Sequence, residues 1–173
     1  MGYTSYFSGS ISVSPPLNEQ EIAYLKDFSA SRRMQRDNGP LYAVPGNDFG
    51  QDHAPDVRDY NHPAEGQPGL WCQWVPDEDG ASIVWDEGEK FYNSAEWMKY
   101  IIDHLFSAEA RTFVKQHWGE DLRFEHFTFN HLFNGEIDVE GEDSADRWQL
   151  VVQNNRVLVA EGTIHYDTPT PLN

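Results

Sequence analysis

The sequence predicts an α+β fold: an antiparallel sheet with two or three helices packed on one face, as a ferredoxin-like βαββαβ core extended by C-terminal strands. Three observations lead to this prediction. Several short segments alternate apolar and polar residues, which is the period of a half-buried strand. Two other segments carry apolar residues at helical spacing behind capping signals. These segments follow one another in an order that begins as a βαββαβ motif.

The first strand and the first helix are expected within the opening segment of the chain. Residues 3–14 are rich in aromatic and β-branched side chains, which favours a strand that ends at Pro15. Asn18 and Glu21 then have the spacing of a helix capping box. Apolar residues follow at helical spacing, so we expect a helix over residues 19–34.

Residues 36–69 are expected to form a long loop, because prolines and glycines recur there without a sustained apolar period. A connection of this length is uncommon inside a compact domain and is often functional or mobile. Part of it is expected to pack onto the domain through its apolar side chains, which are Leu41, Tyr42, Val44, Phe49 and Tyr60.

A hairpin and a second helix are expected next. Residues 70–75 and 81–85 flank a loop that begins with Pro76, which indicates a β-hairpin. Asn93 and Glu96 have the spacing of a second capping box, followed by an apolar stripe that predicts a helix to about residue 106.

The remaining elements are expected to be one short helix followed by strands. A further short helix is expected over residues 107–114, and residues 124–133 predict a strand. After an acidic strand, a hairpin is expected with its turn at Asn154-Asn155. Residues 167–173 contain prolines and are expected to be a flexible tail, with residues 1–173 forming a single domain.

Charge is the most informative bulk property of the chain. The sequence has 12 basic and 29 acidic residues, a formal net charge of −17 over 173 residues. Such a chain repels nucleic acid and anionic membranes and attracts basic surfaces, although the same charge also serves solubility. A single cysteine excludes an internal disulfide. No signal peptide and no apolar run of about 20 residues is visible, so we expect a cytoplasmic protein without a membrane segment.

A row of carboxylates is the most distinctive feature of the sequence. In a strand, alternate residues share one face at a repeat of about 6.8 Å, close to the phosphate spacing of an extended nucleic-acid strand. Ile137 and Val139 then face the opposite way. The row predicts a face that binds a basic protein; a plain solvated face and a cation site are the alternatives. The residues of the row are Glu136, Asp138, Glu140 and Glu142, extended by Asp143 and Asp146.

Two aromatic residues are candidate anchors for a partner. Phe91 and Tyr92 precede the second helix, and interface centres favour aromatic side chains. The same two rings are also suited to cover the seam between the helix and the sheet. Cys72 lies between tryptophans and is interpreted as a small buried hydrophobic residue rather than a nucleophile.

A metal site is a second hypothesis. Histidine and aspartate mixtures can bind Zn²⁺ or a harder ion, although the spacing here matches no established ligand motif. The sequence contains no recognisable catalytic or cofactor-binding motif, so no cofactor and no catalytic residue is predicted. The candidate metal ligands are Asp52, His53, Asp56, Asp59 and His62.

Several stretches resemble a family of uncharacterised proteins found in bacteria and their phages. Residues 66–74 read Gly-Gln-Pro-Gly-Leu-Trp-Cys-Gln-Trp, and residues 134–147 contain Asn-Gly-Glu, Gly-Glu-Asp and Asp-Arg in that order. The similarity runs through most of the chain except residues 37–57. It implies no established activity, and a phage association favours small acidic proteins that block host factors.

The sequence therefore predicts a binding protein rather than an enzyme. Its partner is expected to be a basic host protein contacted through the acidic face, with a nucleic-acid-binding protein as the most concrete version. Direct binding to nucleic acid or to a membrane is not expected. Two other hypotheses remain open: a metal-assisted hydrolase that uses the loop at residues 52–62, and a structural or assembly component of a larger complex.

Overall fold

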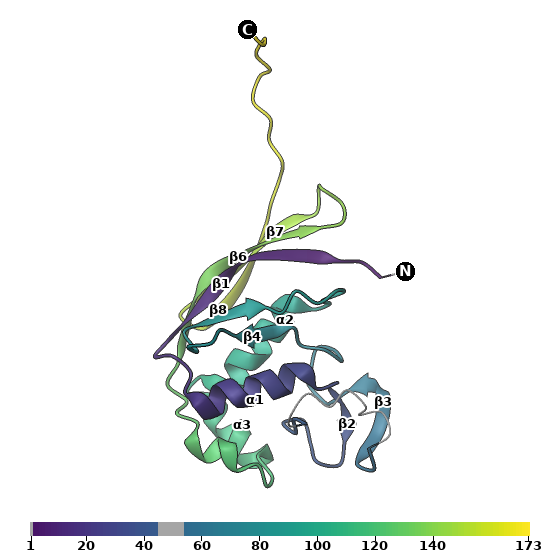
Figure 1. The fold of residues 1–173 in the computed structure, drawn as a ribbon, viewed down its shortest axis with the longest axis vertical. Helices are drawn as coiled ribbons and strands as arrows, with labels where there is room; N and C mark the ends of the chain where they lie inside the picture. Colours follow the sequence, from purple (N-terminus) through teal and green to yellow (C-terminus); the bar gives the residue numbers. More distant parts are fainter. Residues whose placement is uncertain (1, 45–53) are drawn as a thin grey trace.

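A six-stranded antiparallel sheet forms the centre of the fold, with the strand order β4-β5-β1-β6-β7-β8 (Figure 1). The computed structural model describes residues 2–44 and 54–173. The order β4-β5-β1-β6 is that of a βαββαβ core, and β7 and β8 extend it, as the sequence predicts. The strands are β1 (Ser5–Ser14), β4 (Trp74–Pro76), β5 (Ser82–Trp85), β6 (Leu132–Gly141), β7 (Arg147–Gln153) and β8 (Arg156–Glu161).

The helices lie on one side of this sheet (Figure 1). They are α1 (Glu19–Ala30), α2 (Ser94–Ile101), which continues into the π-helical turn η2 (Ile102–Phe106), α3 (Ala110–His117) and the short 3₁₀ helix η3 (Leu122–His126). None of the helices in the described ranges is long and apolar enough to cross a membrane. The predicted α+β class, with helices on one face of an antiparallel sheet, is confirmed.

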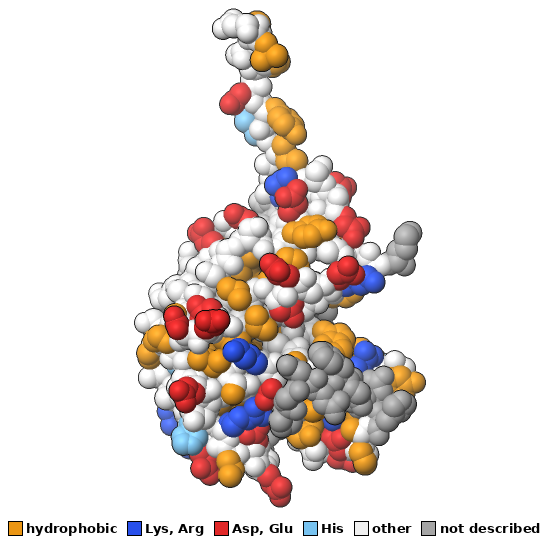
Figure 2. Space-filling view, viewed as in Figure 1, with side chains coloured by type: hydrophobic (Ala, Val, Ile, Leu, Met, Phe, Trp, Pro, Cys, Tyr) orange, Lys and Arg blue, Asp and Glu red, His pale blue; other side chains and the backbone are white. Residues whose placement is uncertain are grey.

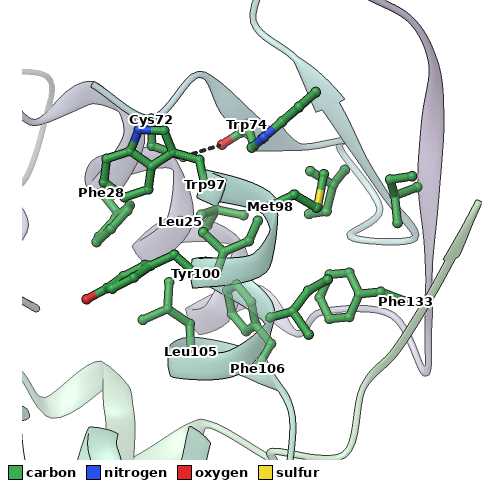
Figure 3. Packing of buried hydrophobic residues seen from close by; sticks show 14 of the residues in the cluster. Leu25, Phe28, Cys72, Trp74, Trp97, Met98, Tyr100, Leu105, Phe106 and Phe133 are labelled. Atoms are coloured by element: carbon green, nitrogen blue, oxygen red, sulfur yellow. Dashed lines mark hydrogen bonds between the residues drawn. The ribbon is translucent and has the colours of Figure 1, made fainter. Parts of the chain in front are cut away.

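The core fills the space between the helices and the inner face of the sheet. Trp97, Met98 and Leu105 from α2 and η2 meet Phe28 of α1 and Phe133 of β6 (Figure 3). Their side chains are fully buried. Large rings therefore supply much of the buried apolar area, as expected for a chain rich in aromatic residues. The inner face of the sheet contributes Phe7, Ile11, Ile83, Ile137, Val139, Leu150 and Val152.

Helix α1 begins with the predicted capping box. The Asn18 side chain accepts a hydrogen bond from the Glu21 N–H (3.0 Å), and Glu21 Oε2 accepts one from the Asn18 N–H (2.8 Å). The helix ends at Ala30 rather than near residue 34. Ser31 has an extended backbone, and its hydroxyl donates to the Asp27 carbonyl, so the chain leaves the helix there.

The stretch predicted to be a loop contains a small sheet, which corrects the prediction. Strand β2 (Met34–Arg36) pairs with β3 (Val57–Pro63), although β3 is polar and ends in proline. Leu41 packs into the core as expected, whereas Tyr60 is exposed and Phe49 lies outside the described residues. Arg33 connects this part to α1: its Nη2 donates to the Pro40 carbonyl (2.6 Å), and its guanidinium stacks 3.9 Å from the Phe28 ring.

Residues 124–133 do not form the predicted strand. They begin within η3, whose N-cap Asp121 accepts from the Arg123 N–H (3.0 Å), and β6 begins only at Leu132. Phe124 and Phe127 insert their rings against Tyr24 of α1, at centroid distances of 4.6 and 5.6 Å. Side chains three residues apart lie on the same side of a 3₁₀ turn, so both rings face Tyr24, whereas in a strand they would lie on opposite faces.

The second predicted capping box is wrong as well. Asn93 adopts a left-handed backbone (φ 56°) and makes no side-chain cap to α2. Its amide donates instead to the Pro68 carbonyl (2.8 Å). The tight turn at Asn154-Asn155 is as predicted. Both residues have positive φ, as in the two-residue turns that connect the strands of a β-hairpin.

A buried polar cluster holds the start of β6 against α1. Glu21 Oε1 lies 3.0 Å from His131 Nε2 and accepts a hydrogen bond from the Thr128 N–H (3.0 Å). His131 Nδ1 lies 2.6 Å from the Pro15 carbonyl, so both ring nitrogens face acceptors and the imidazole is held as a cation. Burial works against this charge. The hydrogen bonds to Glu21 and Pro15 outweigh it and raise the pKa of His131.

Candidate functional site

Strand β6 presents the predicted carboxylates on the outer face of the sheet. Glu136, Asp138 and Glu140 are exposed, and the intervening Ile137 and Val139 are buried in the core. The geometry expected from alternation is therefore confirmed for this part of the row. Within the described residues, all the helices lie on the other side of the sheet, so this face is open.

The neighbouring strand β7 fixes the carboxylates in place. Gln149 lies opposite Asp138, and its Nε2 donates to Asp138 Oδ1 (3.0 Å) and reaches Glu136 Oε2 at 3.4 Å. Arg147 lies opposite Glu140 and forms an ion pair with it (2.8 Å). Because both side chains of that pair are about half exposed, it contributes little to stability. It does reduce the negative charge at one end of the row.

The last members of the row hold the backbone rather than facing solvent freely. Glu142 lies beyond β6, and its Oε1 accepts a hydrogen bond from the Thr4 N–H (2.8 Å). Asp143 accepts from the Ala145 N–H within the turn that joins β6 to β7. Asp146 accepts from the Tyr3 hydroxyl (2.6 Å), and this bond raises the pKa of Tyr3. These three residues therefore shape the hairpin end beside the row.

Strand β1 supplies the other side of the acidic face. Ser10 lies opposite Glu136 and Ser8 opposite Asp138, so small hydroxyl side chains leave the carboxylates accessible. Tyr6 lies opposite Glu140 and is 57% exposed. A hollow of about 410 Å³ opens here, lined by Tyr6, Ser8, Asp138, Glu140, Arg147 and Glu161 among others. We define the acidic face as Tyr6, Glu136, Asp138, Glu140, Arg147 and Gln149.

Tyr6 was not among the residues singled out in the sequence. The signal was present, because Tyr6 shares its parity with the serines of the first strand, whereas Phe7 shares the parity of Ile11 and Val13. Elsewhere on the molecule, carboxylate side chains are spread over the visible surface with few basic groups among them (Figure 2). The molecule as a whole therefore supplies a negative field around the acidic face.

The two candidate aromatic anchors have different environments. Phe91 is buried and packs on Trp74 and Phe7 at centroid distances of 5.0 and 5.6 Å, so its prediction as a contact residue is wrong. Its ring belongs to the core, which is the alternative the sequence left open. Tyr92 is exposed, and its hydroxyl accepts a hydrogen bond from the Tyr3 N–H (3.1 Å).

The candidate metal ligands are only partly described. Asp52 and His53 lie outside the described residues. Asp56 forms an ion pair with Arg36 (3.0 Å), and Asp59 lies 2.8 Å from His62 Nδ1. The Asn61 N–H and His62 lower the pKa of Asp59. In the two described ranges, no group of three or more histidine, cysteine or carboxylate side chains is placed to hold a metal ion.

Cys72 is fully buried in the core, and its thiol lies 4.0 Å from the Trp74 carbonyl oxygen (Figure 3). Burial raises the pKa of its thiol to about 12. A thiolate nucleophile requires the opposite shift, so the interpretation as a buried hydrophobic residue agrees with the structure.

The outward carboxylates and the hollow beside Tyr6 lie together on the outer face of the sheet. Comparison with protein-family models, curated proteins and solved structures finds no match to this chain.

Proposed function

We propose that the protein binds a basic protein surface through the acidic face of its sheet. The observation that supports this most strongly is the arrangement of Glu136, Asp138 and Glu140. These carboxylates share one side of a central strand, and Gln149 bridges two of them from the neighbouring strand. Side chains fixed in this way lose little conformational freedom when a partner binds.

The mechanism we propose is electrostatic. A net charge of −17 accelerates encounter with a cationic surface over distances of about one Debye length, ~8 Å at physiological salt. At contact, lysine or arginine side chains of the partner pair with the carboxylates of the row. Tyr6, beside Glu140, offers an aromatic surface for an apolar or cationic contact and lengthens the lifetime of the complex.

The most concrete form of the proposal is an inhibitor that occupies the nucleic-acid site of a host protein. Alternate residues on a strand repeat at about 6.8 Å, which resembles the spacing of phosphates along an extended strand. The resemblance to phage-associated proteins is compatible with such a role in the cytoplasm.

Two variants with equal charge changes test the proposal. The row variant, Glu136→Gln/Asp138→Asn/Glu140→Gln, removes the three carboxylates of the row that face outward from β6. Glu78→Gln/Asp79→Asn/Glu120→Gln removes the same charge from exposed positions away from the acidic face. Proteins captured from a bacterial lysate on wild type and on both variants are eluted in a salt gradient, and the association rate of each captured protein is then measured.

We expect a basic partner to be retained by wild type and by the control variant, with association at least about tenfold slower for the row variant. Thermal unfolding should be unchanged in both variants, because all six side chains are exposed. Equal capture and equal rates for the two variants would show that net charge alone acts, and would rule out a specific acidic face.

A further inference from the structure

Among the described residues, the sheet edge at β8 is open to backbone pairing. Both edge strands contact a helix, β4 with α1 and β8 with α2. At β4 the outward carbonyl of Trp74 accepts a hydrogen bond from the Ser29 hydroxyl, which partly closes that edge. In the described part of the chain, β8 pairs only with β7. Its register with β7 is regular over the whole strand, and its sequence, Arg-Val-Leu-Val-Ala-Glu, contains neither proline nor lysine. Edge strands are normally protected by a bulge, a proline or charged side chains. Strand β8 has no bulge and no proline, and its two charged residues, Arg156 and Glu161, stand at its ends.

The hydrogen-bonding groups of this edge can be assigned. The Gly162 N–H donates to the Arg147 carbonyl (2.8 Å), so Gly162 continues the pairing with β7. Even-numbered residues of this segment therefore direct their backbone groups toward β7, because orientation alternates along a strand. Val157, Val159 and Glu161 direct their N–H and C=O groups away from the sheet. Val159 is also 57% exposed.

The chain continues beyond β8 as an extended arm, residues 163–173. The arm projects away from the body, and apolar side chains stand out along it (Figures 1 and 2). Ile164 and Tyr166 are exposed, Tyr166 at 83%. They lie two residues apart and share the parity of Leu158 and Ala160. The arm is thus an extended segment with one apolar side that nothing in the described structure covers.

We propose that two copies of this chain associate by pairing the arm of each copy with the β8 edge of the other. A twofold axis perpendicular to the sheet, passing at Gly162, places the two extended segments antiparallel and keeps the same face of both sheets on one side. The free backbone N–H and C=O groups along the β8 edge of each copy then form hydrogen bonds with the arm of the other copy. The six-stranded sheets become one continuous sheet, with the bodies on opposite sides of the axis.

This register matches the side chains. Leu158 faces Tyr166 of the second copy, and Ala160 faces Ile164, both on the outer face. Pairs of aromatic and aliphatic side chains across strands are stabilising. Glu161 faces Thr163 of the second copy. Sliding the pairing so that the axis passes at Glu161 would place two glutamates directly opposite each other, which is unfavourable. A slip of one residue would exchange the faces.

Sedimentation velocity tests the proposal on the full chain, from about 1 to about 100 µM, a range that covers weak complexes. We expect the mass to rise from the 19.9 kDa monomer toward twice that value. Since each copy carries a charge of −17, the dimer should be tighter by about threefold or more at ~1 M than at ~0.15 M NaCl. Binding to a basic partner weakens with salt, so the two associations respond in opposite directions.

Variants of the arm complete the test. Ile164→Asp/Tyr166→Asp should be monomeric over the whole range and fold as wild type, because these side chains do not belong to the core. Thr170→Asp/Leu172→Asp adds the same charge beyond the paired residues and should leave the dimer nearly intact. A wild-type monomer at every concentration, or dimerisation of the first variant equal to that of wild type, would overturn the proposal.

Engineered cysteines test the register. Ala160 and Ile164 of the second copy form a pair in which Cα atoms lie about 4.5 Å apart, within reach of a disulfide. Oxidation of Ala160→Cys/Ile164→Cys should therefore give a covalent dimer. Ala160→Cys/Tyr166→Cys places the thiols diagonally, at about 7–8 Å, and should stay largely uncrosslinked. The reverse result would overturn the register.

Discussion

His131 Nε2 lies 3.0 Å from Glu21 Oε1, and both side chains are buried. The two residues stand 110 positions apart and join the first turn of α1 to the residue before β6. Burial opposes the charge on Glu21, but hydrogen bonds from His131, Asn18 and Thr128 outweigh it and lower the pKa of the carboxyl. The free energy of unfolding therefore depends on pH at both the acidic and the alkaline end, through Glu21 and His131 respectively.

Stability should pass through a maximum in mildly acidic solution. The contribution of Glu21, whose pKa is lowered from 4.5, is lost as the pH falls through its folded pKa. The contribution of His131, whose pKa is raised from 6.5, is lost as the pH rises through its folded pKa. Urea unfolding at about pH 6 and pH 8.5 should show lower stability at the higher pH, with the loss caused by deprotonation of a buried imidazolium.

His131→Gln should remove this alkaline decline. Gln donates to only one of the two acceptors and leaves the Glu21 carboxylate without its counter-charge, so we expect a loss of about 3–5 kcal/mol at pH 6. The exposed pair of His62 with Asp59 provides a control, and His62→Gln should change stability by less than about 0.5 kcal/mol. An unchanged pH profile in His131→Gln would contradict this assignment.

Removing the cation that pairs with the row should strengthen recognition. Arg147→Gln frees Glu140 from its ion pair. Association with a short polylysine peptide, followed by stopped-flow fluorescence, should become about two- to fivefold faster at low salt. Arg156→Gln removes one positive charge at the far end of β8 and is the matched control, with a smaller effect. Equal acceleration in the two variants would mean that the peptide senses only net charge.

Alanine substitution of Phe91 should reduce the free energy of unfolding much more than alanine substitution of Tyr92. Phe91→Ala removes a buried ring that contacts Trp74 and Phe7, and we expect a loss of about 3–5 kcal/mol. Tyr92→Ala removes an exposed ring with one hydrogen bond to the backbone of Tyr3, and should cost about 1 kcal/mol. Chemical denaturation measures the free energy of unfolding of both variants. Equal losses would contradict the prediction.

Cys72 should be inert in the native protein. With a thiol pKa of about 12, roughly one molecule in 10⁴ carries a thiolate at pH 8. Labelling with a thiol-reactive disulfide reagent should be slow until the protein is unfolded, and then complete within minutes. Rapid labelling under native conditions would show that the region around Trp74 opens readily.

Local patterns predicted the parts of the fold in which one rule acts alone. Alternation located β6 and the outward direction of Glu136, Asp138 and Glu140, because a half-buried strand must separate its faces. The capping box at Asn18 located the start of α1 for a similar reason, since donor and acceptor lie within one turn. The turn at Asn154 and Asn155 follows from the tolerance of asparagine for positive φ.

Tertiary contacts decided the parts that were missed. Strand β3 carries no apolar alternation and exists through its pairing with β2. Phe124 and Phe127 do not follow the alternation of a strand, because both rings pack against Tyr24 from a short 3₁₀ turn. The partner of His131 and the exposure of Tyr6 beside Glu140 both depend on segments that only folding brings together.

The alternation of β6 has an evolutionary consequence. Ile137 and Val139 are constrained by packing in the core. Glu136, Asp138 and Glu140 are exposed and are constrained only by contacts at the outer surface. Substitution of an exposed carboxylate does not change the packing of the buried residues. Selection can therefore change binding specificity one residue at a time without a loss of folding stability. A lineage that must follow a changing target could keep this scaffold and alter only what it displays.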